Sequence, residues 1–97
     1  MSNDEQKVIH HPSASGGEFT IGRQAVMSYR DAGDGHIIVN HTLVDPKLRG
    51  KGVAAKLYHA MVEYARKNKL QVTPTCSYAE RMFERYPDDT DVLRKAA

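Results

Sequence analysis

The sequence contains a single cysteine, no tryptophan and no long apolar run. A membrane-spanning helix needs about 18 or more consecutive apolar residues, so we do not expect a membrane protein or a membrane partner. The one thiol, Cys76, excludes a disulfide within the chain, and structural zinc sites ordinarily use two or more thiolates. The cysteine is therefore either a packing residue or a chemically active one.

The chain also has little net charge. It carries 14 Lys and Arg against 12 Asp and Glu, giving a formal net charge of +2, and the two signs are interspersed. This balance does not favour nucleic acid as a partner. The polar, acidic start MSNDEQK lacks the basic and then apolar order of a secretory signal, so we expect a cytoplasmic protein. A length of 97 residues predicts one domain spanning residues 1–97.

The first half of the chain reads as a series of β-strands. Short β-compatible stretches flank the turn-rich segment PSASGG at residues 12–17. In residues 24–30, Ala25, Met27 and Tyr29 then recur at every second position, as on one face of a strand. The Asp- and Gly-rich segment 31–35 predicts a hairpin loop before a β-branched run. The predicted strands are residues 7–10, 18–23, 24–30 and 36–44, which together form an antiparallel meander.

The second half changes to a helical period. Apolar residues recur at helical spacing over residues 53–67, and Asn68 is a candidate left-handed C-cap. We predict a fifth strand at residues 70–75 and a shorter helix over SYAERMFERY, which Pro87 ends. The tail after Pro87 either adds a last turn or frays.

The segment between the fourth strand and the first helix predicts an anion site. A helix start offers free backbone N–H groups and partial positive charge, and glycines at positions 50 and 52 let a ligand approach the backbone. Arg49 and Lys51 add charge, and Ala54 keeps the first turn small. The pattern is neither a Walker loop nor a three-glycine Rossmann loop. The alternative is an ordinary glycine-containing helix start in a basic surface loop.

The hexapeptide Arg49-Gly50-Lys51-Gly52-Val53-Ala54 resembles the R/Q-x-x-G-x-G/A signature of the GNAT superfamily of acetyltransferases. More narrowly, HTLVDPKLRGKGVAAKL followed by VTPTCSYA resembles the small, single-domain, cysteine-containing subfamily of YjdJ type. The resemblance implies an α/β fold with a twisted mixed sheet of about five strands, packed by two or three helices. Its fourth and fifth strands would be parallel and splayed. The implied cofactor is acetyl-CoA or coenzyme A.

The resemblance also implies roles for individual residues. The backbone of Thr42, Leu43 and Val44 would bind the pantetheine arm, and Cys76 would lie near the acetyl thioester. The diphosphate would be held by Arg49, Gly50, Lys51, Gly52, Val53 and Ala54. Many members of the superfamily carry an acidic residue where Leu43 stands, so a general base is absent at that position.

Three side chains are candidates for chemistry, each with a plainer alternative. Cys76 begins a predicted helix, whose dipole favours a thiolate nucleophile, but it also fits a buried packing position. His41 lies near the expected pantetheine site as a candidate base, or else faces the same side as Ile37 and Val39. Tyr78 could give a proton to the coenzyme A thiolate, or simply pack at the helix start. We interpret four further histidines as solvated: His10, His11, His36 and His59.

Three functions remain open from the sequence. The first is an N-acetyltransferase acting on an unidentified amine, either a small molecule or part of a macromolecule, with an acetyl-cysteine intermediate as one route. The second is a non-catalytic module that binds coenzyme A. The third is a basic-loop nucleic-acid protein, which the lack of aromatic residues between Arg49 and Lys56 disfavours. We expect a monomer or a weak dimer.

Overall fold

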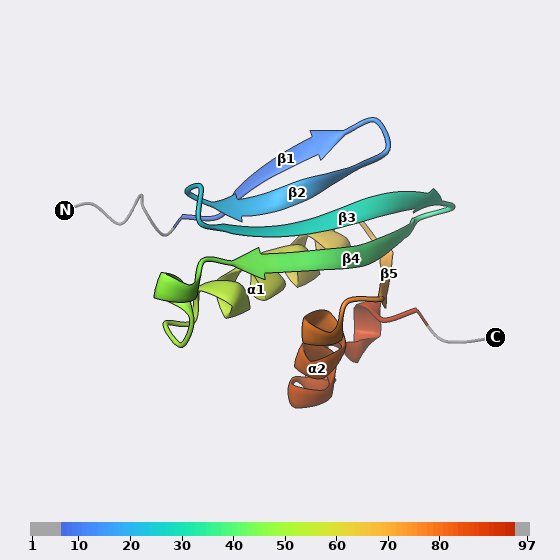
Figure 1. Ribbon diagram of the computed structural model, residues 1–97. Helices are drawn as coiled ribbons and strands as arrows, with labels where there is room; N and C mark the ends of the chain where they lie inside the picture. Colours follow the sequence, from blue (N-terminus) through green and yellow to red (C-terminus); the bar gives the residue numbers. More distant parts are fainter. Residues whose placement is uncertain (1–6, 95–97) are drawn as a thin grey trace.

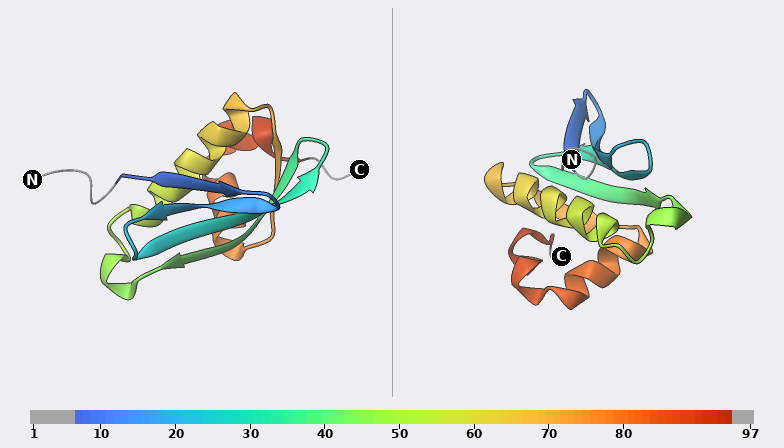
Figure 2. Two further views of the ribbon diagram at one scale, coloured as in Figure 1. Left: turned by 90° about the horizontal axis from the view of Figure 1, so that it is seen from above. Right: turned by 90° about the vertical axis from the view of Figure 1, so that its left-hand side faces the viewer.

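The structure of the protein is a computed structural model that describes residues 7–94. Five strands form one mixed sheet in the order β1-β2-β3-β4-β5, and a long helix, α1, packs on one of its faces (Figure 1). A second helix, α2, lies against β4 and β5 (Figure 2). This is the α/β mixed sheet that the resemblance implied, with β4 and β5 parallel and the other neighbours antiparallel.

The first hairpin is tighter than the sequence predicted. Strand β1 (Ile9–Ser13) and strand β2 (Gly16–Ile21) continue through the predicted loop 12–17, so only two residues form the turn. Pro12 is tolerated because β1 is an edge strand, where a missing N–H need not cost a ladder bond. A Cβ atom at Gly16 would clash with the backbone carbonyl oxygen of Tyr29, so glycine permits the close approach of β2 to β3.

Strand β3 (Ala25–Gly33) and strand β4 (His36–Val44) form the longest pair in the sheet. Their turn is again shorter than predicted: Asp34 and Gly35 make it, with φ values of 56° and 72°. Such left-handed pairs match the twist of a two-residue hairpin. The predicted bounds of β4, residues 36–44, are confirmed.

A β-bulge at Asn40 reverses the faces of β4. Ser28 pairs with His41, whereas the next residue, Tyr29, pairs with Val39, so Asn40 has no partner on β3. Val39 before the bulge is buried, but His41 after it is exposed. The expectation that His41 faces the same side as Val39 is therefore wrong, because one extra residue flips the side-chain alternation.

Strand β5 (Gln71–Pro74) pairs with only the first half of β4. The parallel register joins His36 to Gln71 and ends with Val39 opposite Pro74. The Thr75 N–H then donates to the Val39 carbonyl oxygen at 2.9 Å, and the chain turns away into α2. Beyond this point the end of β4 has no paired neighbour on that side, which confirms the expected splayed strands.

Helix α1 (Val53–Lys67) has the predicted bounds and buries one face against β2, β3 and β4. Tyr58, which the sequence interpretation did not place in the core, is fully buried and contacts Phe83 of α2, Tyr86 and Asp89. Asn68 is the C-cap as predicted, but the left-handed conformation expected for it was wrong: its φ is −101°, and the left-handed residue is Lys69 at 58°.

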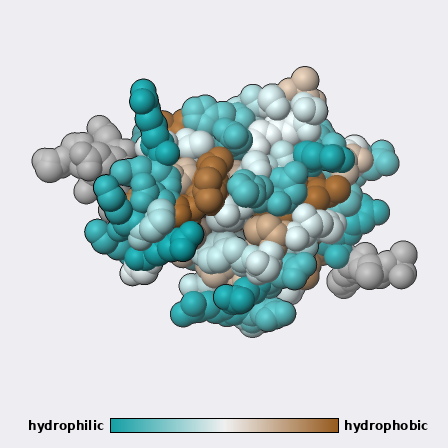
Figure 3. Space-filling view, viewed as in Figure 1, coloured by the Kyte–Doolittle hydropathy of each residue, from teal (hydrophilic) through white to brown (hydrophobic). Residues whose placement is uncertain are grey.

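Helix α2 (Ser77–Arg85) ends before Pro87 as predicted, and a 3-10 helix, η3 (Pro87–Val92), follows. A second 3-10 turn, η2 (Pro46–Leu48), links β4 to the start of α1. Across residues 7–94, no helix is both long and apolar enough to cross a bilayer. In the view of Figure 3, apolar side chains appear as separate spots among hydrophilic ones.

Candidate functional site

A cleft of about 710 Å³ opens where β4 and β5 separate. One wall consists of the end of β4, the η2 turn and the first turn of α1, and the other wall is one face of α2. The residues that line the cleft are Thr42, Leu43, Val44, Leu48, Arg49, Gly50, Gly52, Val53, Ala54, Ala55, Tyr78, Arg81, Met82, Arg85 and Tyr86. Eight of the eleven residues proposed from the sequence are among them; Lys51, His41 and Cys76 are not.

The start of α1 supplies the wall predicted to hold an anion. Gly50 and Gly52 have φ values of 81° and 76°, and a Cβ atom at either would meet open space. Gly52 is the N-cap and provides no side-chain cap, and the first turn has no acidic residue. The N–H groups of this turn therefore have neither an intrahelical acceptor nor a side-chain cap, and the residues of the turn from Gly52 to Ala55 line the cleft.

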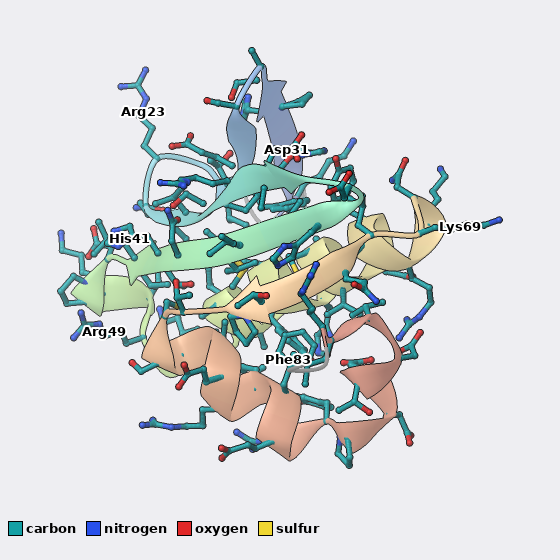
Figure 4. All side chains as sticks on the ribbon, turned by 90° about the vertical axis from the view of Figure 1, so that its right-hand side faces the viewer. Arg23, Asp31, His41, Arg49, Lys69 and Phe83 are labelled. Carbon is teal, nitrogen blue, oxygen red and sulfur yellow. The ribbon has the colours of Figure 1, made fainter. Side chains whose placement is uncertain are left out.

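The η2 turn fixes the direction in which the chain enters α1. The Asp45 carboxylate accepts the Lys47 N–H at 2.9 Å, and Pro46 supplies a preset φ at the first position of the turn. This short turn presents Arg49 and Gly50 to the cleft, while Lys51 remains exposed outside it. Figure 4 shows Arg49 at the end of β4 on the side of α2.

The cleft is lined by three arginines and no carboxylate. Arg49 comes from the loop, and Arg81 and Arg85 come from α2. The sequence interpretation missed the two α2 arginines because it assigned that helix only by its apolar face. Their separation of four residues, which places them on the same side of a helix, is the signal that could have found them.

Cys76 lies between the end of β5 and the start of α2, and it adjoins the cleft without lining it. Its Sγ atom accepts the Ala79 N–H at 3.3 Å as the N-cap of α2. The Thr42 Oγ1 atom lies 3.3 Å from the same sulfur. Thr42 lines the cleft, so the half-buried thiol adjoins it through this contact. A helix start and a backbone donor both stabilise a thiolate.

Tyr78 follows Cys76 by two residues and lines the cleft. Burial raises the pKa of its phenol above the ordinary value, and the neighbouring Tyr86 raises it further. The group is therefore protonated at neutral pH and can act as a proton donor.

The histidines lie away from this cleft. His41 is exposed beside Ser28 on the opposite face of the sheet and does not line the cleft. Three of the four histidines that we expected to be solvated make side-chain hydrogen bonds within the protein, and one of them, the exposed His11, bonds the Thr20 hydroxyl at 3.1 Å. His10 Nε2 lies 2.6 Å from the Tyr29 hydroxyl, and His36 Nε2 lies 2.6 Å from the Thr73 hydroxyl.

Comparison with known proteins identifies the class. Residues 18–92 match the model of the GCN5-related N-acetyl-transferase family, and the chain belongs to this family. The fold is similar to the NMR solution structure of a "GCN5-like putative N-acetyltransferase" from Staphylococcus aureus. That protein is 29% identical, with a TM-score of 0.73, and the match covers 100% of this chain and 94% of that chain. No curated protein matches the sequence. Family and fold together support an acyltransferase.

Proposed function

We propose that the protein is an acetyl-CoA-dependent N-acetyltransferase of the YjdJ-like, cysteine-containing type, formed by a single domain over residues 1–97. The observation that carries the proposal is one continuous cleft. A glycine-rich helix start and three arginines line it, and the thiol of Cys76 adjoins it through Thr42, near the point where β4 and β5 part. A cytoplasmic location, a monomeric or weakly dimeric state, and the absence of nucleic acid or membrane as a partner remain predictions from the sequence.

The residues present fit a phosphorylated thioester cofactor. Gly50 and Gly52 leave the backbone open for an approaching diphosphate, and Arg49 adds a positive charge beside them. The end of β4, at Thr42, Leu43 and Val44, is paired with β3 but not with β5, so on the β5 side it offers backbone groups that an amide-bearing arm can bind. We assign Val53 and Ala54 to the diphosphate wall and Lys51 to a supporting charge at its rim.

Acetyl-CoA would supply an acetyl group activated as a thioester. We assign Cys76 as the nucleophile, because its sulfur is held by the Ala79 N–H beside Thr42. The Cys76 thiolate would form a bond to the acetyl carbon as the bond to the leaving thiolate breaks, and the Tyr78 hydroxyl would protonate that leaving group. An amine would then take the acetyl group from Cys76 and lose a proton, and the thiolate would be regenerated.

The acceptor is an amine, either a small molecule or a group on a macromolecule. Leu43 occupies the position of the usual carboxylate, and His41 lies outside the cleft, so neither wall offers a strong base. In the cysteine route, the amine must reach the acetyl carbon on Cys76 already deprotonated, or lose its proton to water as the Cys76 thiolate leaves. The same lack of a base favours the second candidate function, a module that binds coenzyme A without turnover.

The first test is ligand-induced stabilisation. Coenzyme A or acetyl-CoA should raise the melting temperature, because a ligand that binds only the folded state stabilises it by mass action. ATP and NAD carry phosphates without a pantetheine arm and should raise it much less. The proposal would be refuted if coenzyme A did not raise the melting temperature in a thermal-shift assay, or if ATP raised it equally.

The second test is covalent labelling. Acetyl-CoA without acceptor should leave one acetyl group on the peptide that contains Cys76, detected by intact and peptide mass spectrometry. Hydroxylamine should release it, which separates a thioester from a lysine amide. Cys76→Ala should lose the label but retain binding of coenzyme A, because the diphosphate wall lies on α1.

The labelling results also separate the candidate functions. Turnover of an amine that is unchanged in Cys76→Ala, with no adduct, would replace the cysteine route by direct transfer, with water as the base, since His41 lies outside the cleft. Tight binding of coenzyme A without adduct or turnover on any amine tested would favour the non-catalytic module.

A further inference from the structure

Two arginines on α2 form a cationic surface inside the cleft, separate from the helix start of α1. Arg81 and Arg85 are four residues apart, so they lie on the same side of α2, and both line the cleft. Arg49, from the loop before α1, lines the same cleft. The sequence signature of the family does not include either α2 arginine.

These cations are not neutralised by the protein. Among residues 7–94, the ion pairs involve Arg66, which binds Glu63, Asp89 and Asp91. Within the same range, neither Arg81 nor Arg85 has an ion pair or a side-chain hydrogen bond. Like charges at this spacing destabilise a helix slightly, and Arg49 adds to the repulsion. An anionic ligand between the walls would relieve it.

The position of the two arginines along α2 indicates which anionic group they bind. The helix begins at the thiol of Cys76, and its rise of about 1.5 Å per residue places Arg81 about 7 Å and Arg85 about 13 Å from that end. Along α2, both cations therefore lie beyond the helix start that carries the thiol, and Arg85 lies farther from it than Arg81. The diphosphate is already assigned to the N–H groups of α1 and to Arg49. The two arginines of α2 are therefore available to bind a second anionic group of the same ligand.

We propose that Arg81 and Arg85 bind the ribose 3′-phosphate, the phosphomonoester that distinguishes coenzyme A from dephospho-coenzyme A. The inference rests on the proposed function. A phosphomonoester carries close to two negative charges at neutral pH and accepts the forked hydrogen bonds of arginine. The pair thereby makes the cleft selective for the fully phosphorylated cofactor.

The experiment is isothermal titration calorimetry with coenzyme A and with dephospho-coenzyme A. The wild type should bind coenzyme A about tenfold more tightly. The double variant Arg81→Gln, Arg85→Gln should bind the two ligands within about twofold of each other, mainly through weaker binding of coenzyme A. Glutamine keeps the helix propensity and much of the side-chain length.

A matched control removes the same charge elsewhere. Arg23→Gln with Lys67→Gln also lowers the formal net charge by two, from +2 to 0, at exposed positions outside the cleft. Figure 4 shows Arg23 projecting from the far side of the sheet from α2. This variant should retain the tenfold preference. Circular dichroism and melting curves confirm that each variant is folded.

The outcomes separate this inference from the function on which it rests. Equal affinities for the two ligands in the wild type overturn the inference and leave the coenzyme A site standing. A preference that survives in Arg81→Gln, Arg85→Gln overturns it as well and assigns the phosphate to other cations. A loss of preference in the Arg23→Gln, Lys67→Gln control shows a nonspecific charge effect and also overturns it. If coenzyme A does not bind the wild type at all, the proposed function itself is refuted.

Discussion

The substitution Ala54→Glu tests the diphosphate wall without disturbing a glycine. Ala54 lines the cleft in the first turn of α1, where its backbone is helical, so a larger side chain brings no left-handed strain. Its carboxylate would bind the same N–H groups that a diphosphate needs. Two unit charges about 6 Å apart repel by about 0.7 kcal/mol in bulk water and by about 2.8 kcal/mol at an effective dielectric constant of about 20.

We therefore expect Ala54→Glu to weaken binding of coenzyme A by at least about 1.4 kcal/mol, or tenfold, in titration calorimetry. The fold should survive, because an acidic residue in the first turn is favourable by about 0.3 to 1 kcal/mol. The melting temperature of the Ala54→Glu variant should differ from that of the wild type by less than about 4 °C.

Ala54→Gln is the matched control, since glutamine has nearly the size of glutamate without its charge. Binding to the Gln variant should be reduced less, and the ratio of the two affinities isolates the electrostatic part. Equal affinities of the Glu and Gln variants would refute the charge argument. Wild-type affinity in both would place the diphosphate away from α1.

The remaining predictions concern stability. Gly52→Ala should lower the melting temperature by several degrees, because a φ of 76° costs an L-residue about 1 to 2 kcal/mol. An unchanged melting curve would contradict the left-handed conformation of Gly52. Tyr58→Phe should lose about 1.5 to 3 kcal/mol of unfolding free energy in urea titrations, since the buried hydroxyl donates to the Asp89 carboxylate at 2.8 Å. Burial, and then the nearby charge of His11, lower the pKa of His10 in the folded state. The unfolded chain thus binds the proton first, so stability is complete above about pH 6.5 and falls as the pH drops below it. The loss of melting temperature between about pH 8 and pH 5.5 should be smaller in His10→Phe than in the wild type; an equal loss would place the titration on other groups.

Elements with strong local patterns were predictable. The helical period from Val53 to Lys67 and the β-branched run from His36 to Val44 gave the bounds that the structure has. The hairpin turns were predicted too long, because a local run of Gly, Pro and Ser residues, taken without its sheet partners, is typical of a loop. In the sheet they are paired residues, since Pro12 lies on an edge strand and Gly16 permits close backbone contact with Tyr29.

The sequence determined the wall of the site that is continuous in the chain. Arg49 to Ala54 are neighbours, and the switch from strand to helix around them fixes where their N–H groups point. Those facts need no distant contact, which is why a short motif sufficed to indicate the class of ligand.

The tertiary structure alone decided the rest of the cleft. The bulge at Asn40 exposes His41 on the far face, and the divergence of β5 brings Cys76 to Thr42, a residue 34 positions earlier. The same divergence carries α2 to the cleft, so that two exposed arginines of this helix line it. Such contacts depend on strand register and helix packing, which arise from the burial of the whole core and which no local pattern of residues encodes.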